Sequence, residues 1–214
     1  MIEIENASKI IKGKTVLEGI NYTFQKGISY GLKGINGSGK TMLMRLISGL
    51  IYPTDGRVMI LGKELGKDIS FPDHMGLLLE NPAFLDSYTG MDNLKLLATL
   101  TENAKEKDIK DALVRVGLDP DDKRKYRKYS LGMKQRLGIA AAIMEKPQIL
   151  ILDEPLNALD TDGVALVSEI IKEEKAKGTL IIISCHEEEK LREYADIILI
   201  MENGKIIKCE GEQL

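Results

Sequence analysis

The first part of the chain has the hydrophobic pattern of β-structure. Apolar and polar positions alternate over residues 2–5, and residues 15–24 are rich in side chains that favour strands. A period of two is typical of a strand with one buried face. A short apolar run at residues 28–32 follows and leads into a glycine-rich segment. We therefore predict an antiparallel sheet near the N-terminus and a buried strand after it.

The middle of the chain changes from strand patterns to helical ones. Two more strands are predicted at residues 56–61 and 75–79, and an amphipathic helix is predicted at residues 40–50. From residue 89 to 117, apolar side chains recur at spacings of three and four. A further helix should start after Ser130, where apolar residues again follow one helix face. These stretches predict an inserted, all-helical lobe of roughly sixty residues.

The last third of the chain alternates between the two patterns. Strands are expected at residues 149–152, 180–183 and 197–201, and helices at about residues 162–177 and 187–194. Strands separated by helices of this length indicate right-handed crossovers and a parallel sheet. The expected fold is therefore α/β, with a parallel-sheet core, an N-terminal antiparallel β subdomain and an inserted helical subdomain.

The length and charge of the chain fit one folded domain. Its 214 residues are enough for one sizeable core, expected at about residues 1–81 and 147–214, with the helical subdomain at about residues 82–146. The 30 Lys and Arg residues against 33 Asp and Glu give a net charge of −3, so no nucleic-acid partner is expected. A cluster of cations at residues 123–128 follows several aspartates and is interpreted as a solvated surface.

The composition also argues against a zinc site, a disulfide framework and a membrane span. The chain has 2 cysteines, Cys185 and Cys209, and 2 histidines, which are too few ligands for a structural zinc site. Its longest apolar runs are far shorter than the roughly 20 residues that cross a bilayer. Any role at a membrane would therefore require a partner chain.

The glycine-rich segment carries the first candidate chemistry. Residues 34–41 match the phosphate-binding loop pattern of Gly, four residues and Gly-Lys-Thr. Glycines let the backbone curl so that its N–H groups point at phosphate oxygens, and the following helix adds the positive end of its dipole. Lys40 would reach the β- and γ-phosphates, and the Thr41 hydroxyl would bind Mg²⁺. The predicted nucleotide-binding residues are Gly34, Asn36, Gly37, Ser38, Gly39, Lys40 and Thr41.

Two adjacent acids end the apolar strand at residues 149–152. In a parallel sheet this end opens on the nucleotide side, where Asp153 can hold the Mg²⁺ hydration shell and Glu154 can orient and deprotonate the attacking water. Acids beside a phosphate site would repel ATP unless a divalent cation lay between them, so Mg²⁺ is implied. Without the phosphate-binding loop, such a pair would indicate only a solvated turn.

A histidine ends the next strand. The strand at residues 180–183 runs into Ser-Cys-His, so His186 falls at the same sheet edge as the phosphates and could contact the γ-phosphate. A histidine at a strand end is otherwise more often a surface residue. The predicted catalytic residues are Lys40, Glu154 and His186.

A third motif is carried by residues 129–136, Tyr-Ser-Leu-Gly-Met-Lys-Gln-Arg. It is similar to the signature sequence of the ATP-binding cassette (ABC) transporter family, and the Asn-Ala-Leu-Asp at residues 157–160 and His186 also fall where that family has motifs. The resemblance covers nearly the whole chain, so residues 1–214 are expected to form a single ABC-type ATP-binding domain with a P-loop NTPase core. It implies Mg²⁺-dependent ATP hydrolysis that powers transport through a separate transmembrane permease. The chain would then lie on the cytoplasmic face of the cell membrane, bound through that partner.

The resemblance also implies a second nucleotide-binding subunit, identical or different. In the family, the signature of one subunit closes over the ATP that the other subunit holds, and Asp160 would lie at this interface. Ser130 is a good N-cap, and a helix N-terminus with a serine hydroxyl can bind an anion. A helix cap without further meaning is the simpler interpretation. The signature residues acting in trans would be Ser130, Leu131, Gly132 and Met133.

Several positions depart from the family pattern. In the signature, Leu131 replaces a small residue and Met133 replaces a glutamine. Glu80 stands where the family has the glutamine that senses Mg²⁺ and the membrane partner, so the resemblance assigns it to metal binding and coupling. Ile11 falls near the position of the aromatic residue that stacks on adenine, and it could offer only apolar contact. The combination of Glu80 with residues 81–84, 89–90, 93–94 and 130–133 resembles the bacitracin and lantibiotic exporter branch. This resemblance implies export of a peptide, antibiotic or lipid-like substrate, with import as the less favoured direction.

Two other functions stay open at this point. One is an ABC-type mechanochemical ATPase that works on DNA, ribosomes or iron–sulfur assembly, although the sequence shows no coiled-coil insertion, second cassette or cysteine cluster. The other is a P-loop kinase that phosphorylates a small acceptor. A kinase would leave the signature-like motif and His186 unexplained.

Overall fold

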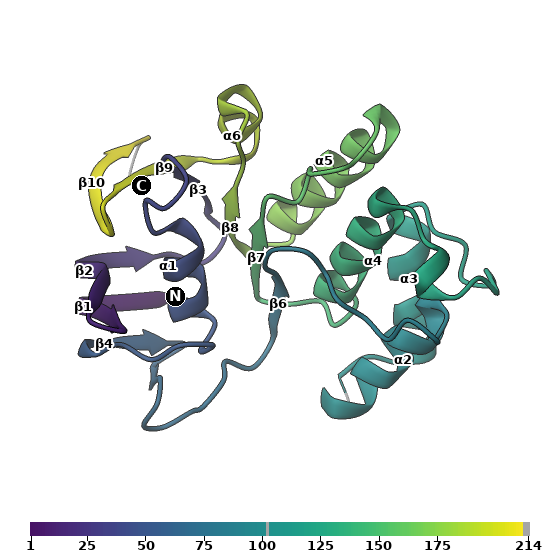
Figure 1. Ribbon diagram of the computed structural model, residues 1–214, viewed down its shortest axis with the longest axis horizontal. Coiled ribbons are helices and arrows are strands. Elements are labelled where there is room, and N and C mark those ends of the chain that lie inside the picture. Colours follow the sequence, from purple (N-terminus) through teal and green to yellow (C-terminus); the bar gives the residue numbers. More distant parts are fainter. Residues whose placement is uncertain (102, 212–214) are drawn as a thin grey trace.

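A six-stranded sheet lies at the centre of the fold in the computed structural model, which describes residues 1–101 and 103–211 (Figure 1). Its strands are β3 (Ser29–Lys33), β6 (Met75–Leu78), β7 (Ile149–Asp153), β8 (Leu180–Ser184), β9 (Ile197–Glu202) and β10 (Lys205–Glu210). They are ordered β10-β9-β3-β8-β7-β6, and all neighbours are parallel except β10 and β9. The structure confirms the expected α/β class with a parallel core.

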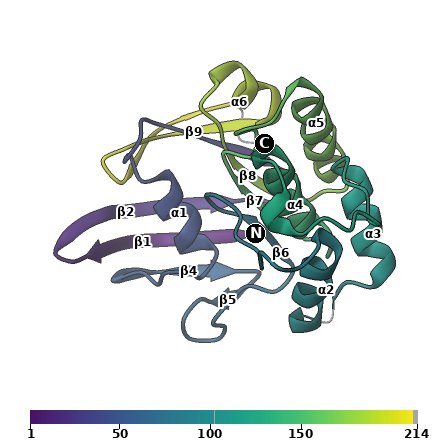
Figure 2. The same ribbon diagram turned by 45° about the vertical axis from the view of Figure 1, so that its right-hand side comes forward.

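A second sheet, which is antiparallel, covers one side of this core. Its strands are β1 (Ile2–Ile11), β2 (Lys14–Phe24), β4 (Asp55–Ile60) and β5 (Lys63–Glu64), in the order β2-β1-β4-β5. Helix α1 (Lys40–Ile47) lies beside β1 and β2 (Figure 2). Its buried apolar side chains, Leu43, Met44, Leu46 and Ile47, belong to one hydrophobic cluster with residues of both sheets. The predicted antiparallel β-structure near the N-terminus is therefore present.

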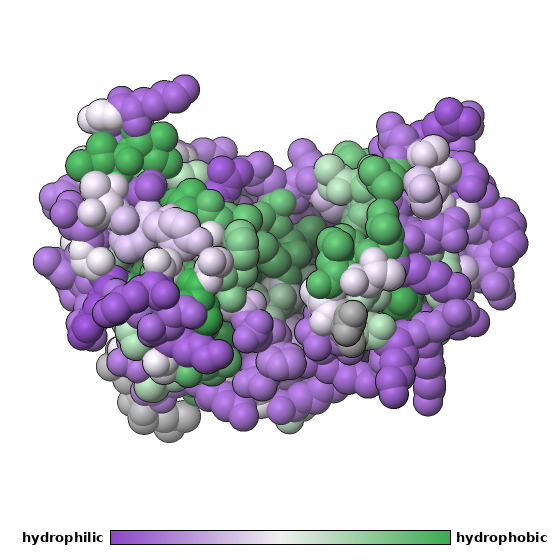
Figure 3. Space-filling model, turned by 90° about the horizontal axis from the view of Figure 1, so that it is seen from below, coloured by the Kyte–Doolittle hydropathy of each residue, from purple (hydrophilic) through white to green (hydrophobic). Residues whose placement is uncertain are grey.

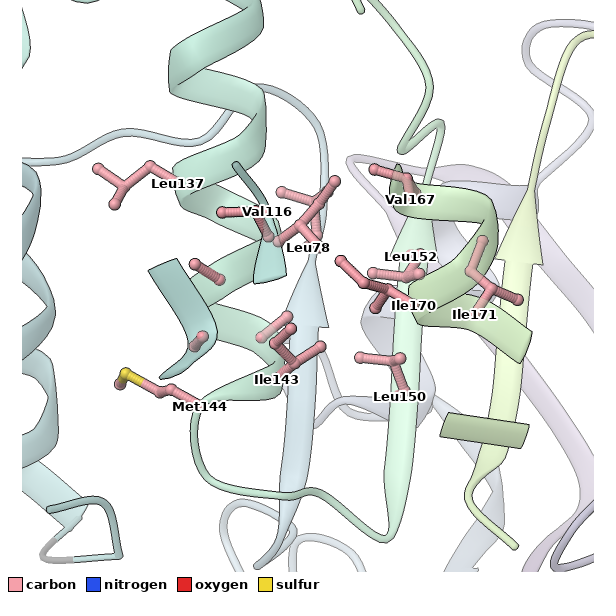
Figure 4. Packing of buried hydrophobic residues seen from close by; sticks show 14 of the residues in the cluster. Leu78, Val116, Leu137, Ile143, Met144, Leu150, Leu152, Val167, Ile170 and Ile171 are labelled. Atoms are coloured by element: carbon pink, nitrogen blue, oxygen red, sulfur yellow. The ribbon is translucent and has the colours of Figure 1, made fainter. Parts of the chain in front are cut away.

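The strands at the centre of the parallel sheet are buried on both faces. Because side chains alternate along a strand, Ile149 and Ile151 of β7 pack in the cluster around α1, whereas Leu150 and Leu152 pack against helices on the opposite face (Figure 4). The helices whose side chains join that second cluster include α4 (Leu131–Ile143), α5 (Thr161–Ala176) and α6 (Glu188–Tyr194). This double burial explains why β7 and β8 are continuously apolar until their last residues.

The segment between β6 and β7 is helical, as predicted. Helices α2 (Gly90–Thr101) and α3 (Glu106–Arg115), a 3₁₀ turn (Tyr126–Lys128) and α4 lie together at one end of the molecule (Figure 1). The cations of residues 123–128 are exposed, whereas Tyr126 is buried and its hydroxyl donates a hydrogen bond to the Pro82 carbonyl (2.6 Å). The subdomain boundaries near residues 82 and 146 stay a prediction. None of the helices in the described residues has the length and apolar character that a membrane span requires.

Two strands were not predicted from the sequence. Strand β5 has 2 residues, which is too short for a recognisable period. Strand β10 pairs with β9 through an irregular register between Ile206 and Lys208, and most of its side chains are exposed. Edge strands of this kind lack the alternation between apolar and polar residues on which strand prediction depends.

Candidate active site

The phosphate-binding loop connects β3 to α1, and its glycines are required by space and by backbone conformation. A Cβ atom on Gly34 would lie 2.5 Å from both the Met201 carbonyl oxygen and the Ser38 hydroxyl oxygen. Gly39, directly before α1, has a φ of +110°, a conformation that favours glycine. The loop therefore folds tightly over the N-terminus of α1, where backbone N–H groups lack partners within the helix.

Lys40 lies inside the curve of this loop. Its ammonium group donates hydrogen bonds to the carbonyl oxygens of Gly34 (2.7 Å) and Ile35 (3.3 Å). The residue is only 9% exposed, and no carboxylate lies within salt-bridge distance of it in the described residues. The neighbouring Ser38 hydroxyl is buried and has no hydrogen-bond partner among the residues that the structure describes. The Lys40 ammonium group is thus held, without a carboxylate partner among the described residues, where the loop could bind a phosphate group.

Thr41 and Asp153 form a pair of oxygen donors beside Lys40. The Thr41 hydroxyl donates to Asp153 Oδ2 (2.7 Å), although the two residues are 112 positions apart. The Ser184 hydroxyl, at the end of β8, donates to Asp153 Oδ1 (2.5 Å). A hydroxyl and a carboxylate fit Mg²⁺, which binds few protein oxygens and keeps water or substrate oxygens as its other ligands. Consistent with this, the described residues contain no group of three or more His, Cys, Asp and Glu that could hold a metal alone.

Glu154 is held in an unusual conformation next to this pair. Its φ of +51° is uncommon for a residue other than glycine, and its backbone N–H donates to the Ser184 hydroxyl oxygen (3.0 Å). The carboxylate accepts a hydrogen bond from the His186 backbone N–H (3.1 Å), and His186 Nε2 lies 3.6 Å from Glu154 Oε1. Burial raises the pKa of the Glu154 carboxyl above its usual range, while His186 acts in the opposite direction. Glu154 and His186 thus form a contacting acid–imidazole pair.

These groups surround one cavity of about 950 Å³. Of the residues that the sequence identified, ten line it: Ile11, Asn36, Gly37, Gly39, Lys40, Thr41, Glu80, Asp153, Glu154 and His186. Further lining residues come from the β1–β2 hairpin, including Lys12 and Lys14. The size and mixed lining are typical of a site for a small-molecule ligand.

Ser130, Leu131, Gly132 and Met133 do not line this cavity, whereas Gln135 of the same motif does. Ser130 is the N-cap of α4, as predicted, and its hydroxyl oxygen accepts a hydrogen bond from the Met133 N–H (3.2 Å). Leu131 is 63% exposed at the tip of the same helix. Asp160 is likewise outside the cavity, where it caps α5 by accepting a hydrogen bond from the Gly163 N–H (2.9 Å). The phosphate-binding loop and the N-terminus of α4 are therefore separate elements, and the helix end lies outside the cavity that the loop lines.

Glu80 lines the cavity, but its carboxylate is engaged elsewhere. Arg45 Nη2, on α1, donates to Glu80 Oε1 at 2.7 Å. The sequence suggested Glu80 as a metal ligand, whereas in the structure its ion-pair partner is Arg45.

Three contacts at the site escaped the sequence analysis. Ser184 pairs with Asp153 in the parallel register of β7 and β8, so aligning the two strand ends could have revealed it. The Gln135 amide of α4 donates to the Glu154 carbonyl oxygen (3.1 Å). Its place in the signature-like motif at residues 129–136 could have identified it as a candidate site residue. The partnership of Arg45 with Glu80 depends on how α1 packs near the chain after β6, for which the sequence carries no local pattern.

Comparisons with known proteins identify the family. The family model described as "ABC transporter" matches residues 17–157. An uncharacterized ABC transporter ATP-binding protein of Bacillus subtilis (strain 168), YybJ, is 52% identical over 210 residues, which cover 98% of this chain and 96% of the relative. The chain belongs to the ABC transporter ATP-binding family. The resemblance inferred from the motifs is thereby confirmed, and the chain is an ABC-type ATPase.

Other relatives of this ABC ATPase have more specific names. The bacitracin transport ATP-binding protein BcrA of Enterococcus faecalis is 40% identical, and the match covers 97% of this chain and 68% of BcrA. The lantibiotic transport ATP-binding protein SrtF of Streptococcus pyogenes is 38% identical, with 97% and 89% covered. A solved structure described as the ATP-binding subunit of an ABC transporter is 26% identical and superposes with a TM-score of 0.90, covering 99% of this chain and 90% of that one.

Ile11 offers a direct test of where the nucleotide base rests. Replacing Ile11 with Tyr is expected to tighten ATP binding about five-fold or more, because stacking a base on an aromatic ring contributes roughly 1–3 kcal/mol. Ile10→Tyr is the matched control, since Ile10 is similarly exposed but does not line the cavity. Calorimetric titration with ATP measures both variants. Equal affinities of the two variants would show that adenine does not rest on Ile11.

Proposed function

We propose that this ABC ATPase is the energy-supplying subunit of an exporter. It would bind Mg²⁺ and ATP in the cavity next to the phosphate-binding loop and drive export of a peptide, antibiotic or lipid-like substrate through a separate permease. The observation that carries this proposal is the convergence of Lys40, Thr41, Asp153, Glu154 and His186 on one cavity. These side chains supply a phosphate-binding cation, metal ligands and a base with a partner.

In this proposal each part of the site acts on one part of the nucleotide. The loop amides and Lys40 bind the phosphates, for which Lys40 exchanges its bonds to the Gly34 and Ile35 carbonyls. Thr41 and Asp153 would hold Mg²⁺, which supplies charge neutralisation at the transferring phosphoryl group. Ser184 keeps the Asp153 carboxylate oriented through its 2.5 Å hydrogen bond.

Glu154 is the proposed general base. Burial raises the pKa of its carboxyl, which makes the carboxylate a better proton acceptor for an attacking water. The contact of His186 with Glu154 (3.6 Å) positions the imidazole next to this base. From there it could also hydrogen-bond the γ-phosphate. Chemistry of this kind needs no acceptor besides water.

A second copy or a related subunit would complete the site. The N-terminus of α4, with Ser130 and the exposed Leu131, presents a helix end that can bind an anion and that lies outside the cavity at the phosphate-binding loop. We therefore propose that the residues Ser130, Leu131, Gly132 and Met133 close over ATP held by the other subunit. Asp160 would lie at the same interface, because the Ala158 carbonyl oxygen of the same segment, residues 157–160, lies next to Gly132 of this helix end.

The export direction and the membrane partner are supported by the relatives. BcrA and SrtF, at 40% and 38% identity, are named for the transport of bacitracin and a lantibiotic.

Apolar side chains also gather on one face of the molecule between more hydrophilic ends (Figure 3). Exposed apolar residues on and before α2 include Leu85, Tyr88, Leu96 and Leu100. We propose that a permease binds near this helical segment and Glu80 and holds the chain on the cytoplasmic face of the membrane.

Membrane fractionation tests the transport assignment. We expect the tagged chain, produced in its native host, to sediment with membranes and to leave them in detergent together with a membrane-spanning subunit. The Lys40→Ala variant should still sediment, because permease binding does not need nucleotide hydrolysis. Recovery of an active ATPase only from the soluble fraction would instead favour a mechanochemical ATPase without a transport partner.

A further inference from the structure

The ion pair between Arg45 and Glu80 lies at the edge of the proposed nucleotide site. Glu80 follows β6 and has a φ of +55°, an uncommon backbone conformation for glutamate. Its side chain is 58% exposed and that of Arg45 is 34% exposed. Glu80 nevertheless lines the same cavity as Thr41 and Asp153. Glu80 thus lines the cavity while its carboxylate forms an ion pair with Arg45.

The position of Arg45 on α1 explains where this carboxylate is held. Thr41 and Arg45 are four residues apart in α1, so they lie on one side of the helix, about 6 Å apart along its axis. Thr41 is bonded to Asp153, and Arg45 is bonded to Glu80. One side of the helix therefore binds two carboxylates from other elements, Asp153 through Thr41 and Glu80 through Arg45, and both line the same cavity.

We propose that Arg45 is a positioning residue that competes with the divalent cation for the Glu80 carboxylate. The inference rests on the proposed nucleotide site and adds a residue that sets its cation affinity. While Arg45 holds Glu80, the Glu80 carboxylate is not available to the cation, which Asp153 and Thr41 would bind. When the cation displaces Arg45, Glu80 adds a second carboxylate to the site. Exposed ion pairs contribute little to stability, so this exchange is readily made.

Mn²⁺ binding to the full chain loaded with ADP tests this competition without measuring turnover. Free Mn²⁺ is measured by electron paramagnetic resonance in the wild type and in the variants Arg45→Met, Glu80→Gln and the combined variant. Arg45→Met should bind Mn²⁺ about five-fold more tightly, because the competing ion pair is removed. The combined variant should bind Mn²⁺ no more tightly than Glu80→Gln alone. Removing Arg45 strengthens binding only by freeing the Glu80 carboxylate, and this carboxylate is absent in both variants.

A matched control separates this effect from a general loss of positive charge. Arg57 forms an ion pair with Glu5 at the same distance, 2.7 Å, on the antiparallel sheet, and Arg57→Met should leave Mn²⁺ affinity unchanged. If Arg45→Met folds poorly, as judged by its circular dichroism, Arg45→Gln provides the same charge removal. An unchanged affinity in the folded Arg45 variant, or a gain that persists in the Glu80→Gln background, would overturn the proposal. Failure of the wild type itself to bind Mn²⁺ with ADP would instead contradict the proposed nucleotide site.

Discussion

Glu154→Gln is expected to lower ATP hydrolysis about 100-fold or more while ATP binding is retained. Removing a general base typically costs two or more orders of magnitude in rate. The amide has nearly the shape of the carboxylate, and its oxygen can still accept the hydrogen bond from the His186 N–H. The ligands of the phosphates and the cation are untouched. Phosphate release measures the rate, and calorimetric titration with ATP measures the binding.

Two companion variants make this result specific. Glu189→Gln changes an exposed glutamate of α6 that does not line the cavity and should keep full turnover. Lys40→Ala should lose activity for a different reason, because it removes the cation from the phosphate-binding loop and weakens ATP binding itself. Turnover at the wild-type rate in Glu154→Gln would refute the role assigned to this residue.

The fold could be predicted where local patterns report burial. Strands β7 and β8 are buried on both faces, so each is a continuous apolar run that ends at a polar residue. Helices α1, α2 and α3 bury one face each, which produces the periods that the sequence carries. Helix α4 is buried around most of its circumference and carries a mainly apolar run instead. Strand β10 lies at a sheet edge with most side chains exposed, and its pairing with β9 leaves little trace in its pattern.

In the candidate site, too, residues within one loop could be predicted from the sequence more easily than contacts between distant elements. Lys40 and Thr41 follow the glycines of one loop, so their positions could be predicted from spacing alone. The meeting of Thr41 with Asp153 across 112 positions was accessible because parallel strands end at a common edge. The ion pair of Arg45 with Glu80 depends on the packing of two side chains from separate elements, which no spacing rule describes.

In the proposed mechanism, two chains share each nucleotide. In the Glu154→Gln background, hydrolysis no longer releases the complex, so ATP with Mg²⁺ is expected to accumulate a dimer. Adding Ser130→Arg places a long, charged side chain at the N-cap of α4, where it would obstruct the helix end proposed to close over the partner's ATP. The second substitution should abolish the dimer, because it lies outside the cavity that binds ATP within one chain. Ser70→Arg, at an exposed serine between β5 and β6, is the matched control.

Sedimentation velocity of these variants, with and without ATP and Mg²⁺, measures this directly. We expect monomers without nucleotide, dimers with ATP in Glu154→Gln and in its Ser70→Arg derivative, and ATP-bound monomers in the Ser130→Arg derivative. A Glu154→Gln protein that stays monomeric at saturating ATP, or a dimer that Ser130→Arg leaves intact, would contradict this mechanism.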